Sequence, residues 1–232
     1  MKKLIIIFDT VRHLKLIQIF YQIWYRIKNK IPQYYKTNYH IKLSSIFWKE
    51  NKLTLTSLFE KKTFSFLNIK HEFLNEIDWN CDEYGKLWTY NLNYFDFLNQ
   101  EEISKKIRLD LIYDYIKKDA SLKEGKEPYP ISLRGINWVK FLSKNEIKDE
   151  LINQTLYSHY RRLFKNLEYH LLGNHLLENA FSLLFGAYYF QDEKFYEKSK
   201  KILFSELNEQ ILNDGGHYEL SPMYHKILYC RL

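Results

Sequence analysis

The stretch that decides the fold spans residues 170–180 and reads HLLGNHLLENA. On a helix, His170, Asn174 and Glu178 would share one face, and His175 and Asn179 would form the stripe beside it. The other positions are mostly leucine, so these polar side chains should project from a helix with buried surroundings. Each buried polar group without a partner costs about 1–3 kcal/mol. The stretch therefore predicts either a hydrogen-bonded network between helices or a polar cleft, and it lacks the acidic partner spacing of a metal site.

A second polar stretch, DGGHYELSPMYH, covers residues 214–225. Ser221 is a favourable N-cap and Pro222 suits the first position of a helix. Tyr224 and His225 would then lie in the first turn, beside unpaired N–H groups and the positive end of the helix dipole. That setting favours a tyrosinate, so Tyr224 could act as a base or an acid. The alternative is a capped helix start with a packed tyrosine.

Helical periodicity extends over much of the remaining chain. We expect helices at residues 9–30, 100–118, 132–143, 146–170, 171–190 and 193–211, and a last one that opens at Ser221-Pro222. A loop that contains Gly125, Pro128 and Pro130 should precede the helix at 132–143, and residues 213–216 should form a turn. The turns between them are short, which favours antiparallel hairpins and suits an α/α bundle and an α/α toroid equally well. Short β-prone stretches at 46–48, 53–58 and 63–66 predict strands or extended cover.

The positive charge lies at the start of the chain. Residues 1–36 carry a net charge of +7, the same as the whole chain. The predicted helix there is amphipathic, so it should pack on the main domain or lie on a membrane surface. A basic arm also suits an acidic polysaccharide, whereas the compact basic-aromatic motif of a nucleic-acid module is missing, so we expect no nucleic-acid partner.

Cysteine usage and the first residues bear on the compartment. Cys81 and Cys230 have the spacing neither of a disulfide framework nor of a zinc site. The apolar run from Leu4 to Phe8 is too short for the core of a signal peptide, which predicts a cytoplasmic or membrane-surface location.

Two further residues are weaker candidates for contact with a ligand. Arg134 could pair with an acidic sugar, although a structural ion pair is the common role of such a residue. Trp138 could form a stacking platform with other aromatic side chains, since 18% of the residues are aromatic, although core packing is the usual role.

The two polar stretches, in this order, resemble the heparinase II/III family of polysaccharide lyases. Similar pieces occur upstream, at residues 11–18, 77–80, 87–96 and 134–138, so the resemblance covers essentially the whole chain. It implies a mainly α fold, an incomplete α/α toroid preceded by an N-terminal amphipathic helix and a short extended or β segment. The implied divisions are residues 1–36, 37–86 and 87–232.

The resemblance also implies a chemistry. A lyase of this family removes the C5 proton of a uronic acid and expels the 4-linked sugar by β-elimination. Asn174 would neutralise the sugar carboxylate, Tyr224 would be the base, the acid or both, and His175 would assist. The substrate-binding residues would be His217, Glu219, His225, Arg134 and Trp138. The partner would be an acidic polysaccharide, with no cofactor and no metal. Export, common in the family, makes the periplasm the alternative location.

Family members continue with more helices and a β-rich domain, whereas this sequence stops at Leu232. We therefore expect a domain that is incomplete or inactive as a lyase. Relatives with such an N-terminal arm are often associated with surface-polysaccharide loci, so the alternative is a non-catalytic protein for glycan binding or surface-polysaccharide assembly. A toroidal glycoside hydrolase would need paired carboxylates; Asp214 and Glu219 are candidates, but their setting matches the lyase pattern better.

Overall fold

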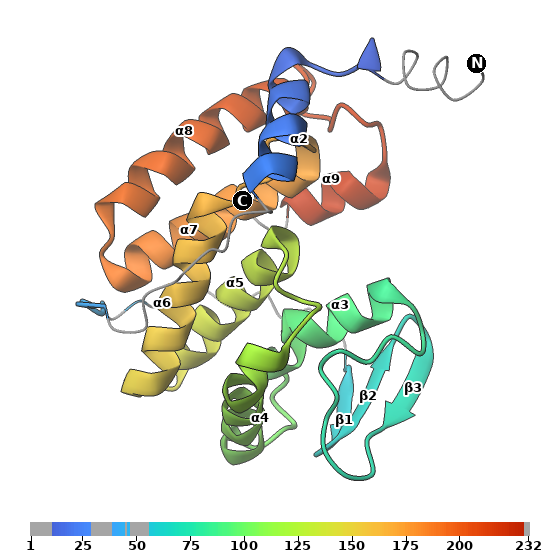
Figure 1. Cartoon of the computed structure of the whole chain (residues 1–232), viewed down its shortest axis with the longest axis vertical. Helices are drawn as coiled ribbons and strands as arrows, with labels where there is room; N and C mark the ends of the chain where they lie inside the picture. Colours follow the sequence, from blue (N-terminus) through green and yellow to red (C-terminus); the bar gives the residue numbers. More distant parts are fainter. Residues whose placement is uncertain (1–10, 29–38, 45, 47–55, 230–232) are drawn as a thin grey trace.

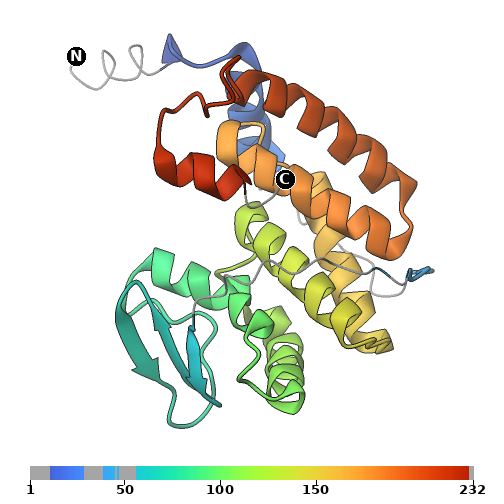
Figure 2. The ribbon, with the colours of Figure 1, turned by 180° about the vertical axis from the view of Figure 1, so that it is seen from behind.

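Helix α5 (Pro128–Lys144) lies at the centre of the protein in a computed structural model that describes residues 11–28, 39–44, 46 and 56–229 (Figures 1 and 2). It contacts α3, α6 and α7, and its residues are almost all buried between Pro130 and Leu142. Pro128 and Pro130, expected in a loop, form its first turn instead. Proline fits there because the first N–H groups of a helix need no intrahelical partner.

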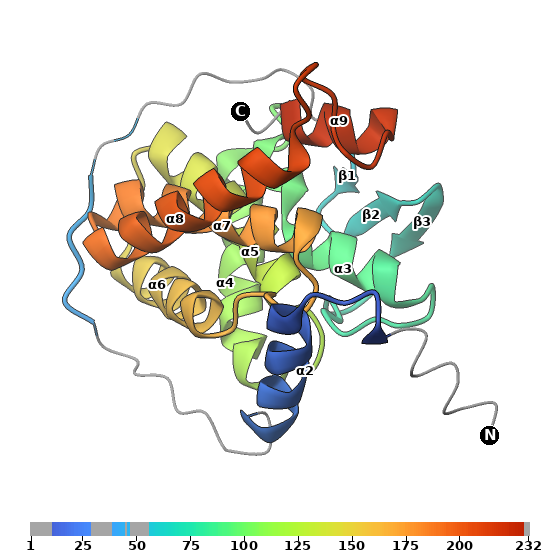
Figure 3. The same ribbon diagram turned by 90° about the horizontal axis from the view of Figure 1, so that it is seen from above.

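Three long helices follow α5, of which the first two pack on it and the third packs on the second. They are α6 (Glu150–Lys165), α7 (Gly173–Phe190) and α8 (Glu193–Gln210). Asp149 caps α6 and Asp192 caps α8, each by accepting backbone N–H bonds. Helices α7 and α8 lie side by side as a hairpin (Figures 1 and 3). The mainly helical fold expected from the sequence is confirmed.

The segment before α5 carries a small sheet and two helices. Strands β1 (Leu58–Glu60), β2 (Thr63–Phe66) and β3 (Ile69–Glu72) form one antiparallel sheet in that order. Helix α3 (Lys86–Tyr94), the 3-10 turn η1 (Asp96–Asn99), helix α4 (Lys105–Lys118) and the 3-10 turn η2 (Asp119–Ser121) follow. The sheet packs on α3 through Phe66 and Trp88, whose ring centroids are 5.3 Å apart.

The expectations for this segment were partly met. The strand at 63–66 is confirmed, while those at 46–48 and 53–58 lie largely outside the described residues. Strand β3 was missed because its signal is the two-residue turn Leu67-Asn68, where both residues have positive φ. Helix α3 was missed because its asparagines and aromatics are weak helix formers. One continuous hydrophobic core runs from Leu58 to Ile202, and the divisions at 36–37 and 86–87 stay a prediction.

Helix α2 (Leu16–Lys28) packs on the protein with an unexpected face. Tyr21 stacks on Tyr169 at 4.7 Å, and Gln18 donates to the Leu171 carbonyl oxygen at 3.1 Å. The apolar stripe points the other way, with Phe20 62% and Ile23 55% exposed. The expected packing of this helix on the main domain is therefore confirmed, although tyrosine and glutamine side chains make the contacts. Within the described residues, the structure holds no helix long and apolar enough to cross a membrane.

The chain breaks its helical path between α6 and α7. The predicted helices 146–170 and 171–190 end and begin elsewhere, because residues 166–172 turn. Leu172 and Gly173 both have positive φ, and the N–H groups of Leu171 and Leu172 bond to the Glu168 carbonyl. A helix cannot continue through two left-handed residues. His170 is therefore not on the helix face of Asn174 and Glu178, and that expectation is wrong.

Candidate functional site

A buried carboxylate organises the start of α7. Glu168 is 5% exposed and accepts a hydrogen bond from the Asn179 amide at 2.9 Å. Asn179 in turn accepts the Glu168 backbone N–H at 2.9 Å and donates to the Ser132 hydroxyl at 3.1 Å. These bonds tie the turn after α6 to both α7 and α5. Part of the polar stretch is therefore an interhelical network, one of the two outcomes expected from the sequence.

The second oxygen of Glu168 faces His175. It lies 3.2 Å from His175 Nδ1, and the His175 side chain is 45% exposed. A Nδ1–H that donates to Glu168 would leave Nε2 as the acceptor. The Tyr129 ring lies against the imidazole, with centroids 4.7 Å apart. Sequence reasoning missed Glu168 and Tyr129, because both reach His175 only through the turn at 166–172 and the proline start of α5.

A second buried carboxylate joins the two polar stretches. Glu206 on α8 is 5% exposed, and it hydrogen-bonds to the backbone of Gly173 and to Gln210 Nε2 at 2.9 Å. Gln210 Oε1 lies 3.2 Å from His217 Nε2, and both side chains are buried. Burial raises the Glu206 pKa, an effect that the Gln210 bond opposes. Through Glu206 and Gln210, helix α8 thus contacts both the start of α7 and the second polar stretch.

A tight turn returns the chain to α8 at this point. The Gly216 N–H bonds to Asp214 Oδ1 at 2.9 Å, and Gly215 has a φ of +84°. Ile211 and His217 then pair as an antiparallel bridge. The turn expected at 213–216 is confirmed. It places Tyr218 beside α7, because a Cβ on Gly173 would lie 3.1 Å from the Tyr218 hydroxyl.

Helix α9 (Pro222–Tyr229) begins at the Ser-Pro pair as predicted. Tyr224 stands in its first turn, and its side chain lies outside the described part of the chain. Leu228 packs in one cluster with Leu177 and Phe181 of α7. The helices that carry Asn174 and Tyr224 are thus packed together, as Figure 2 shows.

The remaining predicted residues fall into two groups. Asn174 is half-buried at the start of α7, and His225 and Glu219 are exposed, with the Glu219 N–H 3.4 Å from His217 Nδ1. Arg134 is 1% exposed and donates to the carbonyl oxygens of Gly125 and Asn93. Trp138 is fully buried as well. A substrate contact of Arg134 or Trp138 would need those side chains to become accessible, and their role stays a prediction.

A row of aromatic rings leads away from His175. Tyr129 is followed by Tyr94 and then Tyr90, with centroid distances of 6.1 and 6.4 Å. The Tyr90 hydroxyl donates to Glu127 at 2.8 Å, and burial raises the pKa of Tyr90 to about 12. Lys86 lies over the Tyr90 ring at 5.1 Å and is 58% exposed. The row therefore ends at a cation.

Two hollows among the described residues lie elsewhere. One has a volume of about 390 Å³ and is lined by Asp78, Trp79, Asn80 and Lys118, among others. The other lies between residues 44–46 and the end of α7 at Tyr188. Neither is lined by Asn174 or His175, which stand half-buried at the start of α7.

Comparison with known proteins finds a family model that matches this part of the chain. Residues 131–229 match the family model for the heparinase II/III N-terminus, and they include both polar stretches. The resemblance to the heparinase II/III family is confirmed over this part of the chain. A heparin-sulfate lyase of Bacteroides stercoris is 31% identical over 90 residues, which are 37% of this chain and 14% of that protein. No solved structure matches the chain.

The contact between Gly173 and Tyr218 can be tested by two matched substitutions. Gly173→Ala and Gly215→Ala each put a Cβ on a residue with positive φ, which costs about 1–2 kcal/mol. Only at Gly173 does the new Cβ also meet Tyr218, whereas nothing lies within 4 Å at Gly215. We expect Gly173→Ala to lower the melting temperature more. Equal losses in thermal unfolding would contradict the contact.

The Glu206 network predicts a pH effect. Because the Glu206 pKa is raised in the folded protein, its contribution is fully present below the pKa of the unfolded chain and is lost as pH rises through the folded value. Glu206→Gln does not titrate, so the melting temperature of the variant minus that of the parent should grow as pH rises above the ordinary carboxyl range. A difference that stays constant or shrinks with pH would count against the buried carboxylate.

Proposed function

We propose that this chain is a polysaccharide lyase-related domain that binds uronic-acid glycans at the start of α7. The observation that carries the proposal is the Glu206 network, which brings the Asn174-His175 pair and the 217–225 stretch to one end of the molecule. The family relation of residues 131–229 supports it, and so does the similarity to the heparin-sulfate lyase of Bacteroides stercoris.

The chemistry of β-elimination fits the groups gathered there. The C5 proton of a uronic acid becomes acidic only when the neighbouring carboxylate is neutralised by donors. Asn174 would supply an amide donor, since its side chain has no hydrogen-bond partner among the described residues. His175, oriented by Glu168 through Nδ1, would present Nε2 as acceptor, and Tyr224 would transfer a proton. The half-buried rings of Tyr129 and Tyr90, at the two ends of the row, would stack on further sugars, whereas Tyr94 between them is buried.

We further propose that the helical hairpins form part of an α/α toroid. The packing of α6 and α7 on α5, and of α8 on α7, is compatible with that architecture. The alternative function, glycan binding or surface-polysaccharide assembly without turnover, would use the same surface.

The test uses heparan sulfate, with binding followed by calorimetry and elimination by the absorbance of the unsaturated product. Asn174→Ala should weaken binding about tenfold or more, because a charge-assisted hydrogen bond is lost. Tyr224→Phe should leave binding intact and, where the parent eliminates, lower the elimination rate about 100-fold. Glu168→Gln should lower the rate with little change in affinity, because it acts through His175.

Tyr188→Phe is the matched control, since Tyr188 is 55% exposed at the far end of α7. Both its affinity and its rate should equal those of the parent. Binding by the parent without elimination would favour the non-catalytic alternative. If heparan sulfate and other uronic-acid polymers fail to bind at all, both functions are rejected.

The exposed face of α2 favours a second function, contact with an anionic lipid surface. Residues 11–28 hold four basic and no acidic residues, and the outward apolar residues follow helical spacing. These are Leu16, Phe20, Ile23, Trp24 and Ile27, each at least 46% exposed.

Vesicle sedimentation tests this contact. The protein should bind vesicles that contain phosphatidylserine, and a Phe20→Ser/Trp24→Ser variant should bind about tenfold less, because two apolar side chains are lost from the lipid contact. High salt should also weaken binding. Equal binding by the parent and the double variant would exclude this face as the contact.

A further inference from the structure

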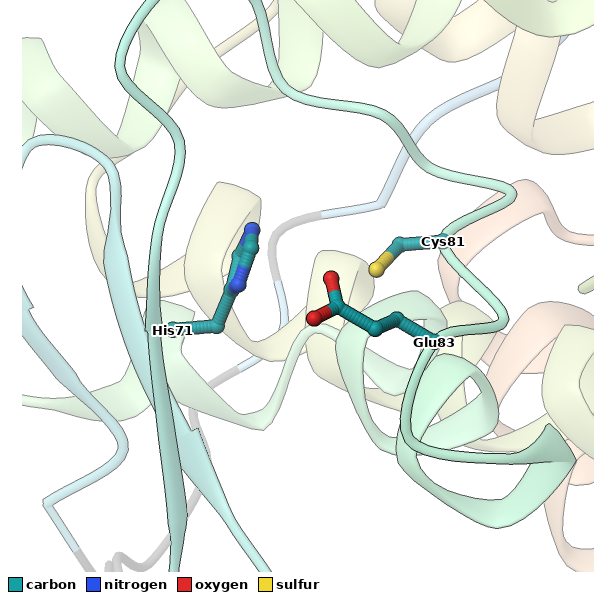
Figure 4. Close-up of side chains that lie close together, drawn as sticks. All are labelled: His71, Cys81 and Glu83. Atoms are coloured by element: carbon teal, nitrogen blue, oxygen red, sulfur yellow. The ribbon is translucent and has the colours of Figure 1, made fainter.

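A cysteine, a histidine and a glutamate converge far from the start of α7. Their ligand atoms, on His71, Cys81 and Glu83, all lie within 4.8 Å of one another. His71 belongs to strand β3, whereas Cys81 and Glu83 lie in the loop before α3. Figure 4 shows the three side chains directed toward one another across the gap between the strand and the loop.

These three donor types suit one class of metal ion. A thiolate, an imidazole and a carboxylate are the ligands of Zn²⁺ and related divalent transition metals, whereas Mg²⁺ and Ca²⁺ take oxygen ligands. Three protein ligands would leave a fourth tetrahedral position for solvent. Because the residues are ten and two positions apart, their spacing matches no sequence motif for zinc, and the sequence predicted none. The antiparallel pairing of β2 and β3 is what brings His71 to the loop.

The surroundings hold the ligands in place. The Tyr84 hydroxyl lies 3.0 Å from His71 Nδ1, and the Phe73 ring packs against the imidazole with centroids 4.4 Å apart. Metal-bound histidines are usually oriented by such a hydrogen bond on a ring nitrogen. The Cys81 backbone is fixed at both polar groups, since its N–H bonds to the Asp78 carbonyl and its carbonyl accepts the Thr89 hydroxyl.

The local charge favours a cation. Cys81 is 8% exposed, and the carboxylates of Asp78, Asp82 and Glu83 lie near its thiol. A divalent cation bound there would offset part of this negative charge.

We propose that His71, Cys81 and Glu83 form a binding site for Zn²⁺ or a related divalent transition metal, which clamps the small sheet to the loop before α3. The site is independent of the glycan function, because none of its residues contacts the start of α7. On binding, the Cys81 thiol loses its proton to solvent, and the sulfur forms a bond to the metal.

Cobalt is the probe for this site, because a Co²⁺–thiolate bond gives a charge-transfer band in the near ultraviolet. The full chain, reduced and metal-free, is titrated with Co²⁺ and then with Zn²⁺. We expect the band to appear, to saturate at one equivalent and to disappear when Zn²⁺ displaces the cobalt. Cys81→Ser should abolish the band, while Cys230→Ser, the matched control, should retain it. His71→Ala and Glu83→Gln should each weaken Co²⁺ binding about tenfold or more, and Glu72→Gln on the same strand should not.

A second measurement separates metal loss from misfolding. Zn²⁺ should slow alkylation of Cys81 in the parent and in Glu72→Gln but not in His71→Ala, with the far-ultraviolet circular dichroism of each metal-free variant compared with that of the parent. The proposal is overturned if the parent gives no thiolate band, if the band survives Cys81→Ser, or if folded His71→Ala binds Co²⁺ as the parent does. None of these outcomes bears on heparan sulfate binding.

Discussion

The arrangement of the candidate site depends on the buried carboxylate of Glu206. A charge that leaves water costs several kcal/mol unless hydrogen bonds replace the lost hydration. Here the replacements come from two places, the backbone of Gly173 and the amide of Gln210, which in turn contacts His217. One helix therefore fixes the position of two stretches that are about 40 residues apart in the chain. The raised pKa of Glu206 shows that this compensation is incomplete.

The non-helical turn at residues 166–172, before α7, fixes the position of Glu168 in a comparable way. Were residues 166–172 helical, Glu168 would project from the last turn of α6 without facing Asn179. The left-handed residues Leu172 and Gly173 fold the chain back, so that Glu168 bonds to Asn179 and faces His175 at once. The positive φ costs about 1–2 kcal/mol at Leu172, whereas Gly173 adopts it without this cost. The network that they permit contains several buried hydrogen bonds, and the loss of any one partner would cost about as much.

Periodicity was enough to predict the helices that surround α5, and turn chemistry was enough to predict the Asp214-Gly215-Gly216 turn and the Ser221-Pro222 start. Periodicity failed as a guide where tertiary contacts override the local preference of the chain. His170 and Asn174 have perfect helical spacing, yet the turn at 166–172 separates them. The apolar stripe of α2 predicted a packed face, but tyrosines and a glutamine make the contacts instead. Glu168 and Glu206 carried no signal of their own, because a lone glutamate in a helical stretch is ordinarily solvated.

The two halves of the candidate site pack against different hydrophobic clusters. Behind Asn174 and His175, the next residues of α7 enter the main hydrophobic core, where Leu176 and Ala180 are almost fully buried. Tyr224 stands on a helix whose described anchor is Leu228, in a small cluster of four buried residues that includes Leu177. Regions with few buried apolar contacts open at lower free energy than the core does. Under the proposed function, the main core would hold the amide and the imidazole in place, and the tyrosine would approach the bound sugar from a separate helix.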